Sequence, residues 1–85
     1  MRVLIPSALQ SYTRSTWVEA QGGTVDAVLW DLDRQYPGIR FRMIDEQGGI
    51  RRHIRFFVDS EQVFRLDAPL SPAQSLHIVQ ALSGG

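Results

Sequence analysis

The sequence of 85 residues contains no cysteine and no lysine. Without cysteine the chain can form neither a disulfide framework nor a thiolate metal site, and it has no nucleophilic thiol. No apolar run approaches the roughly 20 residues that a membrane-spanning helix needs. The apolar start is interrupted by Pro6, too early for a secretory signal. We therefore expect a cytoplasmic protein with no membrane partner.

Charge and composition indicate a single globular domain. Nine arginines balance nine carboxylates, so the formal net charge is zero and gives no overall attraction to nucleic acid or to a membrane surface. Hydrophobic residues make up 44% of the chain, which is too high a share for a disordered polymer. We expect one domain over residues 1–81, followed by a flexible C-terminal tail over residues 82–85.

Hydrophobic periodicity predicts one helix and five strands. The helix is expected over residues 24–36, because apolar residues recur at helical spacing between Thr24, a suitable N-cap, and the stop at Pro37. Alternating apolar residues predict strands at residues 2–5, 17–21, 50–58, 63–66 and 75–81. Residues 9–14 are expected to form a loop, and residues 39–47 an irregular segment with Phe41 and either Met43 or Ile44 turned inward.

The resulting order, β-β-α-β-β-β, predicts an α+β fold with one main helix packed on one face of a mixed sheet. Alternation along the strands assigns their side chains to two faces. The helix-facing side is expected to carry Val3, Ile5, Phe56, Val58, Phe64, Leu66, Leu76 and Ile78. The opposite side would expose an apolar patch with a basic rim, and such patches commonly mark protein interfaces. We predict partner docking there through Leu4, Phe57, Val63 and Val79, with Arg55, Arg65 and His77 at the rim.

The motifs of conventional catalysis are missing. His53 and His77 lack metal-binding spacing, and no serine lies in a G-x-S-x-G motif. The glycine pairs at residues 22–23 and 48–49 are not followed by the Lys and Ser or Thr of a phosphate-binding loop. We therefore expect neither an enzyme, nor a metal site, nor a stably bound cofactor.

A basic cluster lies between residues 40 and 55. Its aromatic neighbours Phe41 and Phe56 would suit RNA, with arginines on the phosphates and rings under the bases, although nucleic-acid-binding domains are usually basic overall. Docking of an acidic protein partner and a simply solvated surface are the other two interpretations. The cluster consists of Arg40, Arg42, Arg51, Arg52 and Arg55, with His53 among them.

The sequence ends in Gly84-Gly85, a pair with a specific chemical use. An enzyme that activates a C-terminal carboxylate draws it through a narrow channel to ATP, and only glycine leaves no side chain in that channel. Four extended residues reach about 13 Å, so the tail can enter a partner while the domain stays outside. We predict that Gly85 bears the reactive carboxylate and that Leu82, Ser83 and Gly84 enter the partner's active site. The other interpretation of this ending is a frayed, glycine-rich tail without a function of its own.

These features together resemble the MoaD/ThiS family of sulfur carriers, which has the ubiquitin-like β-grasp fold. The residues at the turn 72–74, at Asp59 and at Gln80 depart from the family's usual pattern, which leaves the subfamily open. The resemblance is carried by the ending SLHIVQALSGG at residues 75–85, by the helix boundaries at residues 23–25 and 36–38, and by the segments 57–59 and 67–70.

The resemblance implies a carrier that acts through other enzymes. A ubiquitin-activating-type adenylyltransferase would adenylate Gly85 with ATP, and a sulfur donor enzyme would convert the carboxylate to a thiocarboxylate. An acceptor synthase would then take the sulfur for molybdopterin, cysteine or a thio-metabolite. Two alternatives stay open: a ubiquitin-like protein modifier conjugated through Gly85, and a small nucleic-acid-binding module that uses the cluster at residues 40–55.

Overall fold

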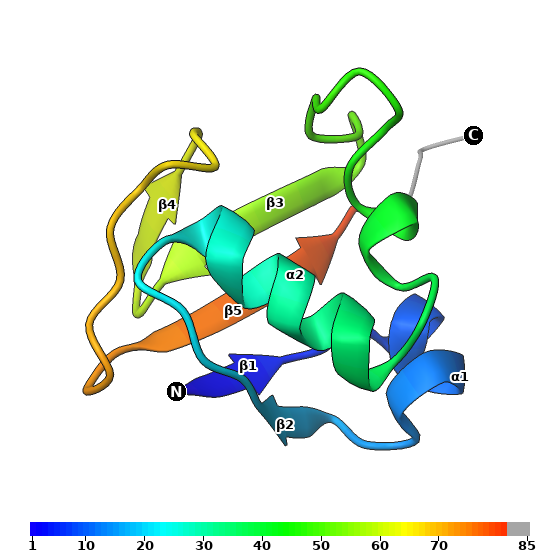
Figure 1. The fold of residues 1–85 in the computed structure, drawn as a ribbon, viewed down its shortest axis with the longest axis horizontal. Coiled ribbons are helices and arrows are strands. Elements are labelled where there is room, and N and C mark those ends of the chain that lie inside the picture. Colours follow the sequence, from blue (N-terminus) through cyan, green and yellow to red (C-terminus); the bar gives the residue numbers. More distant parts are fainter. Residues whose placement is uncertain (82–85) are drawn as a thin grey trace.

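Five strands form a single mixed sheet in the computed structural model of the chain, which describes residues 1–81 (Figure 1). Their order across the sheet is β2-β1-β5-β3-β4, with β1 parallel to β5 and every other neighbouring pair antiparallel. The predicted element order and the mixed sheet are confirmed. The strands are β1 (Arg2–Leu4), β2 (Trp17–Glu19), β3 (Ile54–Val58), β4 (Glu61–Val63) and β5 (Ser75–Gln80).

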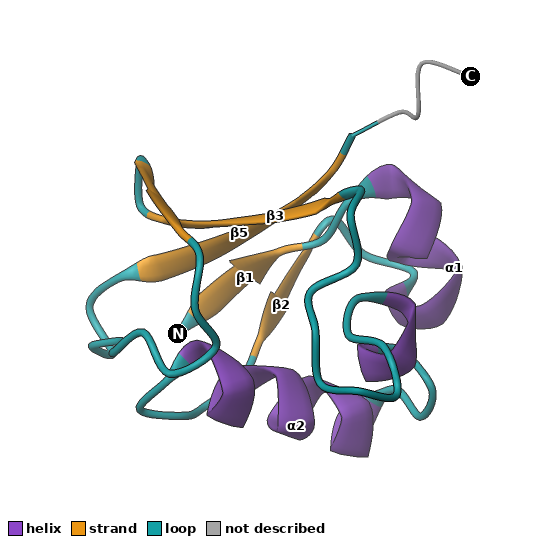
Figure 2. Cartoon of the chain, turned by 90° about the horizontal axis from the view of Figure 1, so that it is seen from above, coloured by secondary structure: helices purple, strands orange, loops and turns teal. Residues whose placement is uncertain are grey.

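The main helix, α2 (Val25–Gln35), packs on one face of the sheet, and no described element lies over the other face (Figure 2). Thr24 caps the helix as predicted, because its Oγ1 accepts a hydrogen bond from the backbone N–H of Ala27 at 3.1 Å. Of the predicted apolar stripe, Val25, Val28, Leu29 and Leu32 are fully buried, whereas Tyr36 follows the helix and is partly buried against the core.

The turn before α2 brings backbone against backbone at Gly22. A Cβ atom there would lie 2.6 Å from the backbone nitrogen of Val28 and 2.8 Å from the carbonyl carbon of Ala27. Only glycine therefore fits at this position, although a Cβ at the neighbouring Gly23 would meet nothing within 4 Å.

The segment after α2 closes one end of the core. Ile39, Met43 and Ile44 are fully buried around the short 3₁₀ helix η2 (Arg40–Arg42). Phe41 lies on the outer side of this turn and is 54% exposed, so the prediction that it turns inward is wrong. Ile39 and Met43, two residues before and after Phe41, take the buried positions of this turn, and the ring of Phe41 lies against the guanidinium of Arg51 instead.

Two predicted strands have different bounds. β3 begins at Ile54 rather than at residue 50, because Ile50 pairs with Ile44 in an isolated bridge and residues 51–53 form a turn. β4 begins at Glu61 rather than at residue 63, because the hairpin turn is short, contains Asp59 at a φ of 54° and pairs Glu61 with Val58. It ends at Val63 rather than at residue 66. Phe64 consequently lies beyond the strand and is 75% exposed, which contradicts its predicted place in the core.

The segment predicted as a loop at residues 9–14 is helical. It contains the 3₁₀ helix η1 (Ser7–Leu9) and the single turn α1 (Gln10–Thr13), which ends at Arg14 with a φ of 58°. Within residues 1–81, no helix has both the length and the apolar composition to cross a membrane.

Candidate functional site

The chain leaves the sheet at the end of β5, its central strand. This strand is paired with β1 on one side and with β3 on the other. After Gln80, the backbone N–H of Ala81 donates a hydrogen bond of 2.7 Å to the carbonyl oxygen of His53. The predicted tail residues Leu82, Ser83, Gly84 and Gly85 lie outside the described residues.

A row of side chains crosses the open face of the sheet. The register pairs Leu4 with Trp17 on one side and with His77 on the other. His77 is paired in turn with Phe57, and Phe57 with Gln62. Residues paired in register point to the same side of a sheet, so these side chains form one line, the open-face row. It runs through Trp17, Leu4, His77, Phe57 and Gln62.

Polar contacts hold His77 in the middle of the open-face row. Its ring meets the indole of Trp17 edge-on, with the centroids 5.5 Å apart, and the guanidinium of Arg2 lies 4.2 Å from the centre of that indole. The Oγ of Ser75 is 3.2 Å from Nε2 of His77 and 3.2 Å from Oδ1 of Asp59. Because an ionised carboxylate can only accept, Ser75 donates to Asp59 and accepts from His77.

A shallow apolar hollow lies beside the root of the tail, between the end of β1 and the end of β5. Its volume is about 300 Å³, and Val79 on its wall is 40% exposed. Val79 and Arg55 are paired in register, on the same side of the sheet as the open-face row. The hollow can therefore receive an apolar side chain from a protein that docks on this face. It is lined by Leu4, Ile5, Pro6, Ser7, Ala8, Ile78, Val79 and Gln80.

Val63 and Arg65 do not join this face. Val63 is paired with Phe56, which is buried in the core, and it packs on the core from the helix side. Arg65 lies beyond the end of β4, where Asp67 pairs with its guanidinium at 2.8 Å. The predicted face of Val63 is wrong because the hairpin register pairs Val63 with Phe56, and residues paired in register share a face.

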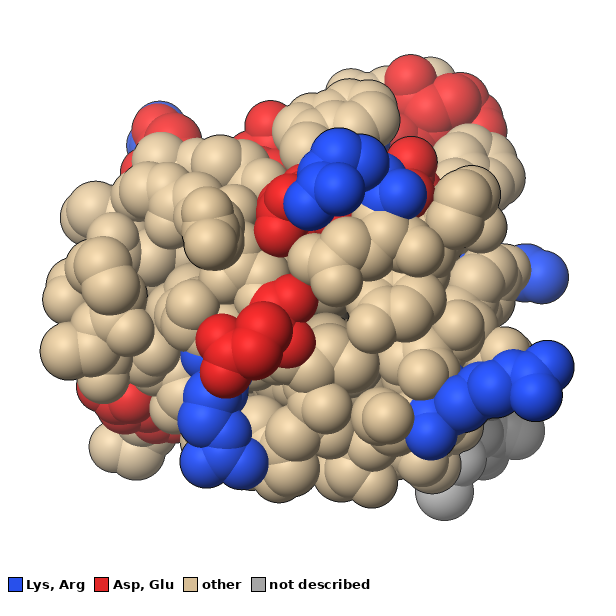
Figure 3. Space-filling view, turned by 60° about the horizontal axis from the view of Figure 1, so that its bottom comes forward, with Lys and Arg blue, Asp and Glu red and all other residues tan. Residues whose placement is uncertain are grey.

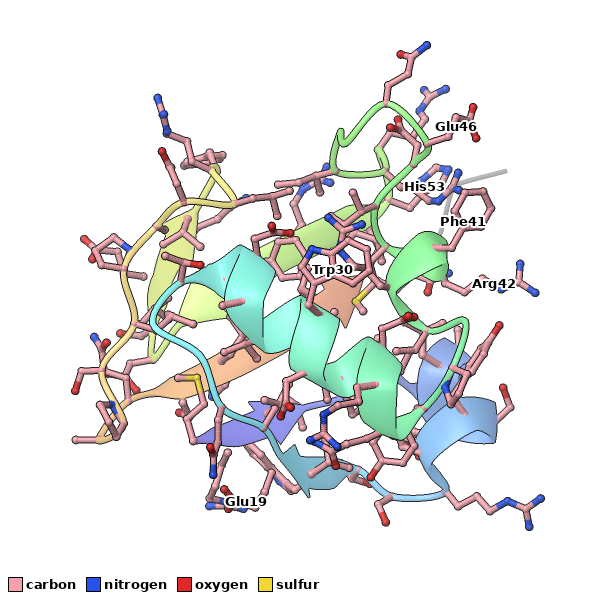
Figure 4. All side chains as sticks on the ribbon, viewed as in Figure 1. Glu19, Trp30, Phe41, Arg42, Glu46 and His53 are labelled. Carbon is pink, nitrogen blue, oxygen red and sulfur yellow. The ribbon has the colours of Figure 1, made fainter. Side chains whose placement is uncertain are left out.

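Most of the basic cluster lies near the root of the tail, whereas Arg40 pairs with Asp26 of α2 at 2.8 Å and lies over the ring of Trp30. Arg42 and Gln80 line the same small hollow, and Arg55 lies across from Val79. His53, whose carbonyl holds Ala81, lies in the turn just before β3. In Figure 4, Phe41, Arg42 and His53 lie together at the end of the molecule where β5 stops.

The aromatic residues of this cluster do not form a platform for bases. Phe56 is 1% exposed and belongs to the core. Phe41 is exposed, but the guanidinium of Arg51 lies 4.6 Å from the centre of its ring and covers one face. Stacking of successive bases needs several free ring faces, so the pattern that suggested RNA binding in the sequence is not present in the structure.

The perturbed carboxylates serve local structure. Hydrogen bonds from Arg34 and from the backbone N–H of Gln21 hold the pKa of Asp31 below its usual range. Backbone N–H groups of the turn that it closes do the same for the pKa of Asp45. Within residues 1–81, no three histidine or carboxylate side chains lie close enough together to hold a metal ion.

Two parts of this surface are not evident from the sequence. Strand alternation places Trp17 on one face together with Glu19, but only the register shows that this is the face of Leu4 and His77. The apolar hollow arises where the chain turns away after β1, which no periodicity reveals.

Comparison with known proteins identifies similar chains. The model of the ThiS family matches residues 3–85. Sulfur carrier protein CysO from Mycobacterium bovis is 34% identical over 90 residues, an alignment that covers 98% of this chain and 96% of the relative. CysO proteins of two Mycobacterium tuberculosis strains match with the same values.

Solved structures agree with this similarity. A chain in the crystal structure of the Amycolatopsis orientalis BexX/CysO complex is 32% identical and superposes with a TM-score of 0.90, over 99% of this chain and 98% of that chain. Mycobacterium tuberculosis CysO is 31% identical with a TM-score of 0.89, over 95% and 98% of the two chains. SAMP1 from Haloferax volcanii, 23% identical with a TM-score of 0.80 over 100% and 98%, shares the fold.

Proposed function

The chain belongs to the ThiS family, and from this premise we propose that it is a sulfur carrier whose cargo is borne on the carboxyl group of Gly85. The family match spans residues 3–85 and therefore includes both the sheet and the terminal glycines. The observation that carries the proposal is the similarity to sulfur carrier proteins over 98% of the chain. The predicted ubiquitin-like β-grasp fold and family resemblance are confirmed by the same similarity.

The proposed chemistry takes place on the tail and is catalysed by partners. An adenylyltransferase joins the carboxylate of Gly85 to the α-phosphate of ATP and releases pyrophosphate. A sulfur nucleophile then attacks the acyl carbon, so that a C–S bond forms and the C–O bond to AMP breaks. The acceptor takes the sulfur from the resulting thiocarboxylate, and water restores the carboxylate. ATP is thus a substrate of the partner, and this chain needs no cofactor and no active site of its own.

The open-face row and the hollow beside it are the proposed docking surface for the adenylyltransferase. Leu4, Phe57 and Val79 lie on this face, and the root of the tail lies at its edge. A partner seated there can receive the tail at the same time. The complex of CysO with BexX in Amycolatopsis orientalis supports a further protein partner, the acceptor synthase. We place the whole system, including a sulfur donor enzyme, in the cytoplasm.

The chemistry of the chain restricts the alternative role as a protein modifier to attachment of single copies. The sequence has no lysine. The amino group of Met1 donates to the carbonyl oxygen of Ala20 at 2.8 Å and lies 3.6 Å from a carboxylate oxygen of Glu19. An activated Gly85 therefore meets no side-chain amine on another copy of this chain. Copies of the chain cannot be joined to one another through amide bonds to lysine. A sulfur carrier gains from this, because an amine would consume its activated end.

Mass spectrometry of the intact protein tests the proposed function. The protein ending at Gly85 is incubated with the adenylyltransferase of the same organism, ATP and sulfide. We expect the mass gain that corresponds to exchange of one oxygen for sulfur, located in the C-terminal peptide. A variant that lacks Gly84 and Gly85 should show no gain and should melt at the same temperature as the wild type.

Two other outcomes would contradict the carrier role. Amide-linked adducts on lysines of added proteins, without thiocarboxylate, would support a modifier. Tight binding of single-stranded RNA at physiological salt, unaffected by loss of Gly84 and Gly85, would support the nucleic-acid-binding alternative.

A further inference from the structure

The zero net charge of the chain is the sum of a basic part and an acidic part. Residues 40–55 hold five arginines and two carboxylates, Asp45 and Glu46, so this stretch carries a net charge of +3 and the rest of the chain −3. On the face shown in Figure 3, by contrast, basic and acidic side chains are mixed and separated by wide uncharged areas. The basic excess is therefore local, and it lies at the root of the tail.

Three of these arginines are held by neutral groups. Arg42 donates from Nε to the hydroxyl of Tyr12 at 2.8 Å, and Arg51 donates from Nε to a backbone carbonyl at 2.7 Å. Arg55 donates to two backbone carbonyls, at 2.6 Å and 3.0 Å. Together with the exposed Arg52, these residues are the arginine collar. Such contacts restrict the guanidinium groups without neutralising their charge.

Three arginines outside the collar, by contrast, form ion pairs. Arg34, Arg40 and Arg65 each have an aspartate within 2.8 Å. Within residues 1–81, no arginine of the collar has a carboxylate within the 4.0 Å that defines an ion pair. Like charges gathered in this way repel one another in the free protein. A preorganised group of cations recovers that free energy when an anionic surface covers it.

We propose that the arginine collar docks an acidic protein surface at the mouth of the channel that receives the tail. The inference rests on the proposed function and names the chemistry of the partner. Residues 82–85 span at most about 14 Å when fully extended. An enzyme that holds Gly85 must therefore approach Ala81 to within that distance, and its rim covers the collar. The collar orients the domain and draws the tail toward the channel.

A protein fits the collar better than a nucleic acid does. The exposed aromatic rings near it are already partnered, since Arg51 covers Phe41 at 4.6 Å and Arg40 covers Trp30 at 4.0 Å. Bases would find few free ring faces to stack on. The chain as a whole is neutral, so a polyanion gains no long-range attraction to it. Carboxylates on a folded protein surface pair with guanidinium groups at short range. This pairing requires neither free ring faces nor a net positive charge on the chain.

The test compares two double variants that remove the same charge. Arg42→Gln/Arg52→Gln removes half of the collar, whereas Arg14→Gln/Arg34→Gln removes two exposed arginines at the end of α1 and in the last turn of α2. ATP–pyrophosphate exchange by the adenylyltransferase of the same organism is measured against carrier concentration, at low and at high salt. Thermal unfolding of each variant shows that the fold is kept.

We expect the collar variant to raise KM for the carrier about tenfold at low salt with kcat unchanged, because rim charges act mainly on association. The control should stay within about twofold of the wild type, and high salt should reduce the difference. An equal KM for both variants overturns the inference and leaves the proposed function intact. So does collar-dependent binding of a single-stranded RNA oligonucleotide with an unchanged KM. A wild type that supports no exchange at all overturns the proposed function and, with it, this inference.

Discussion

The rings of Trp17 and His77 meet edge-on, 5.5 Å apart, above the side of Leu4 that faces away from α2. The contact exists because β1 lies between β2 and β5, so that residues at the two ends of the chain become near neighbours. It makes the middle of the open face partly polar, with apolar surface on both sides at Leu4 and Phe57. This arrangement is the geometric basis of the proposed docking surface.

The docking surface predicts a difference between two exposed apolar residues. Val79→Asp places a charge in the hollow beside the root of the tail and should raise KM for the carrier in ATP–pyrophosphate exchange about tenfold, because docking would have to strip water from the new carboxylate. Ala73→Asp is the matched control, since Ala73 is exposed in the turn before β5, at the opposite end of that strand from Val79. Equal KM values for the two variants would show that the open face does not bind the adenylyltransferase.

The close approach at the start of α2 predicts opposite outcomes at adjacent glycines. Gly22→Ala forces a Cβ to within 2.6 Å of the backbone nitrogen of Val28 and should lower the melting temperature by about 10 °C, as overpacking against a rigid backbone does in a small domain. Gly23→Ala meets nothing within 4 Å and should change the melting temperature by no more than a few degrees. Circular dichroism during heating measures both. Equal melting temperatures would falsify the described geometry of this turn.

Asp31 predicts a pH-dependent contribution to stability. Its carboxylate accepts hydrogen bonds from Arg34, from Gln35 and from the backbone N–H of Gln21, and its pKa in the folded protein is lowered chiefly by Arg34. A lowered folded pKa contributes stability above the unfolded value, near pH 4, and this contribution is lost as the pH falls through the folded pKa.

The variant Asp31→Asn should therefore melt about 5 °C below the wild type at neutral pH, the usual effect of losing one or two charge-assisted hydrogen bonds in a small domain. The difference should shrink as the pH falls below about 4. Glu61→Gln, on an exposed residue of β4, serves as the control. A difference that stays constant from neutral to acidic pH would mean that the charge of Asp31 contributes nothing.

The register of β4 predicts unequal roles for two phenylalanines. Phe56→Ala should lower the free energy of unfolding by about 3–5 kcal/mol, because Phe56 is 1% exposed in the core and truncation leaves a cavity. Phe64→Ala should change it by no more than about 0.5 kcal/mol, because an exposed side chain loses little on truncation. Urea unfolding measures both values. A large loss of unfolding free energy for Phe64→Ala would mean that Phe64 packs in the core, as expected from the longer strand that the sequence suggested.

Local patterns in the sequence were sufficient to predict the helix and most of the sheet. Thr24 caps α2 and the stripe from Val25 to Leu32 is buried, because helical periodicity and capping depend only on residues within one or two turns. The strand that ends at Val58 was extended too far toward residue 50, since the bridge between Ile44 and Ile50 is a contact that strand alternation does not reveal. The place of Val63 was wrong for a related reason, because its face is set by the hairpin register, which pairs it with Phe56 of the core.

The sequence by itself determined the family resemblance, the order of the elements and the terminal Gly84-Gly85, since these depend on residue types and short spacings. Only the tertiary structure decided which side chains share the open face and that the arginine collar surrounds the root of the tail. Both follow from the pairing of β5 with β1 and β3, which brings residues 2–4, 54–58 and 75–80 together. Such contacts join segments far apart in the chain, and their register is set by packing of the whole core rather than by any local pattern.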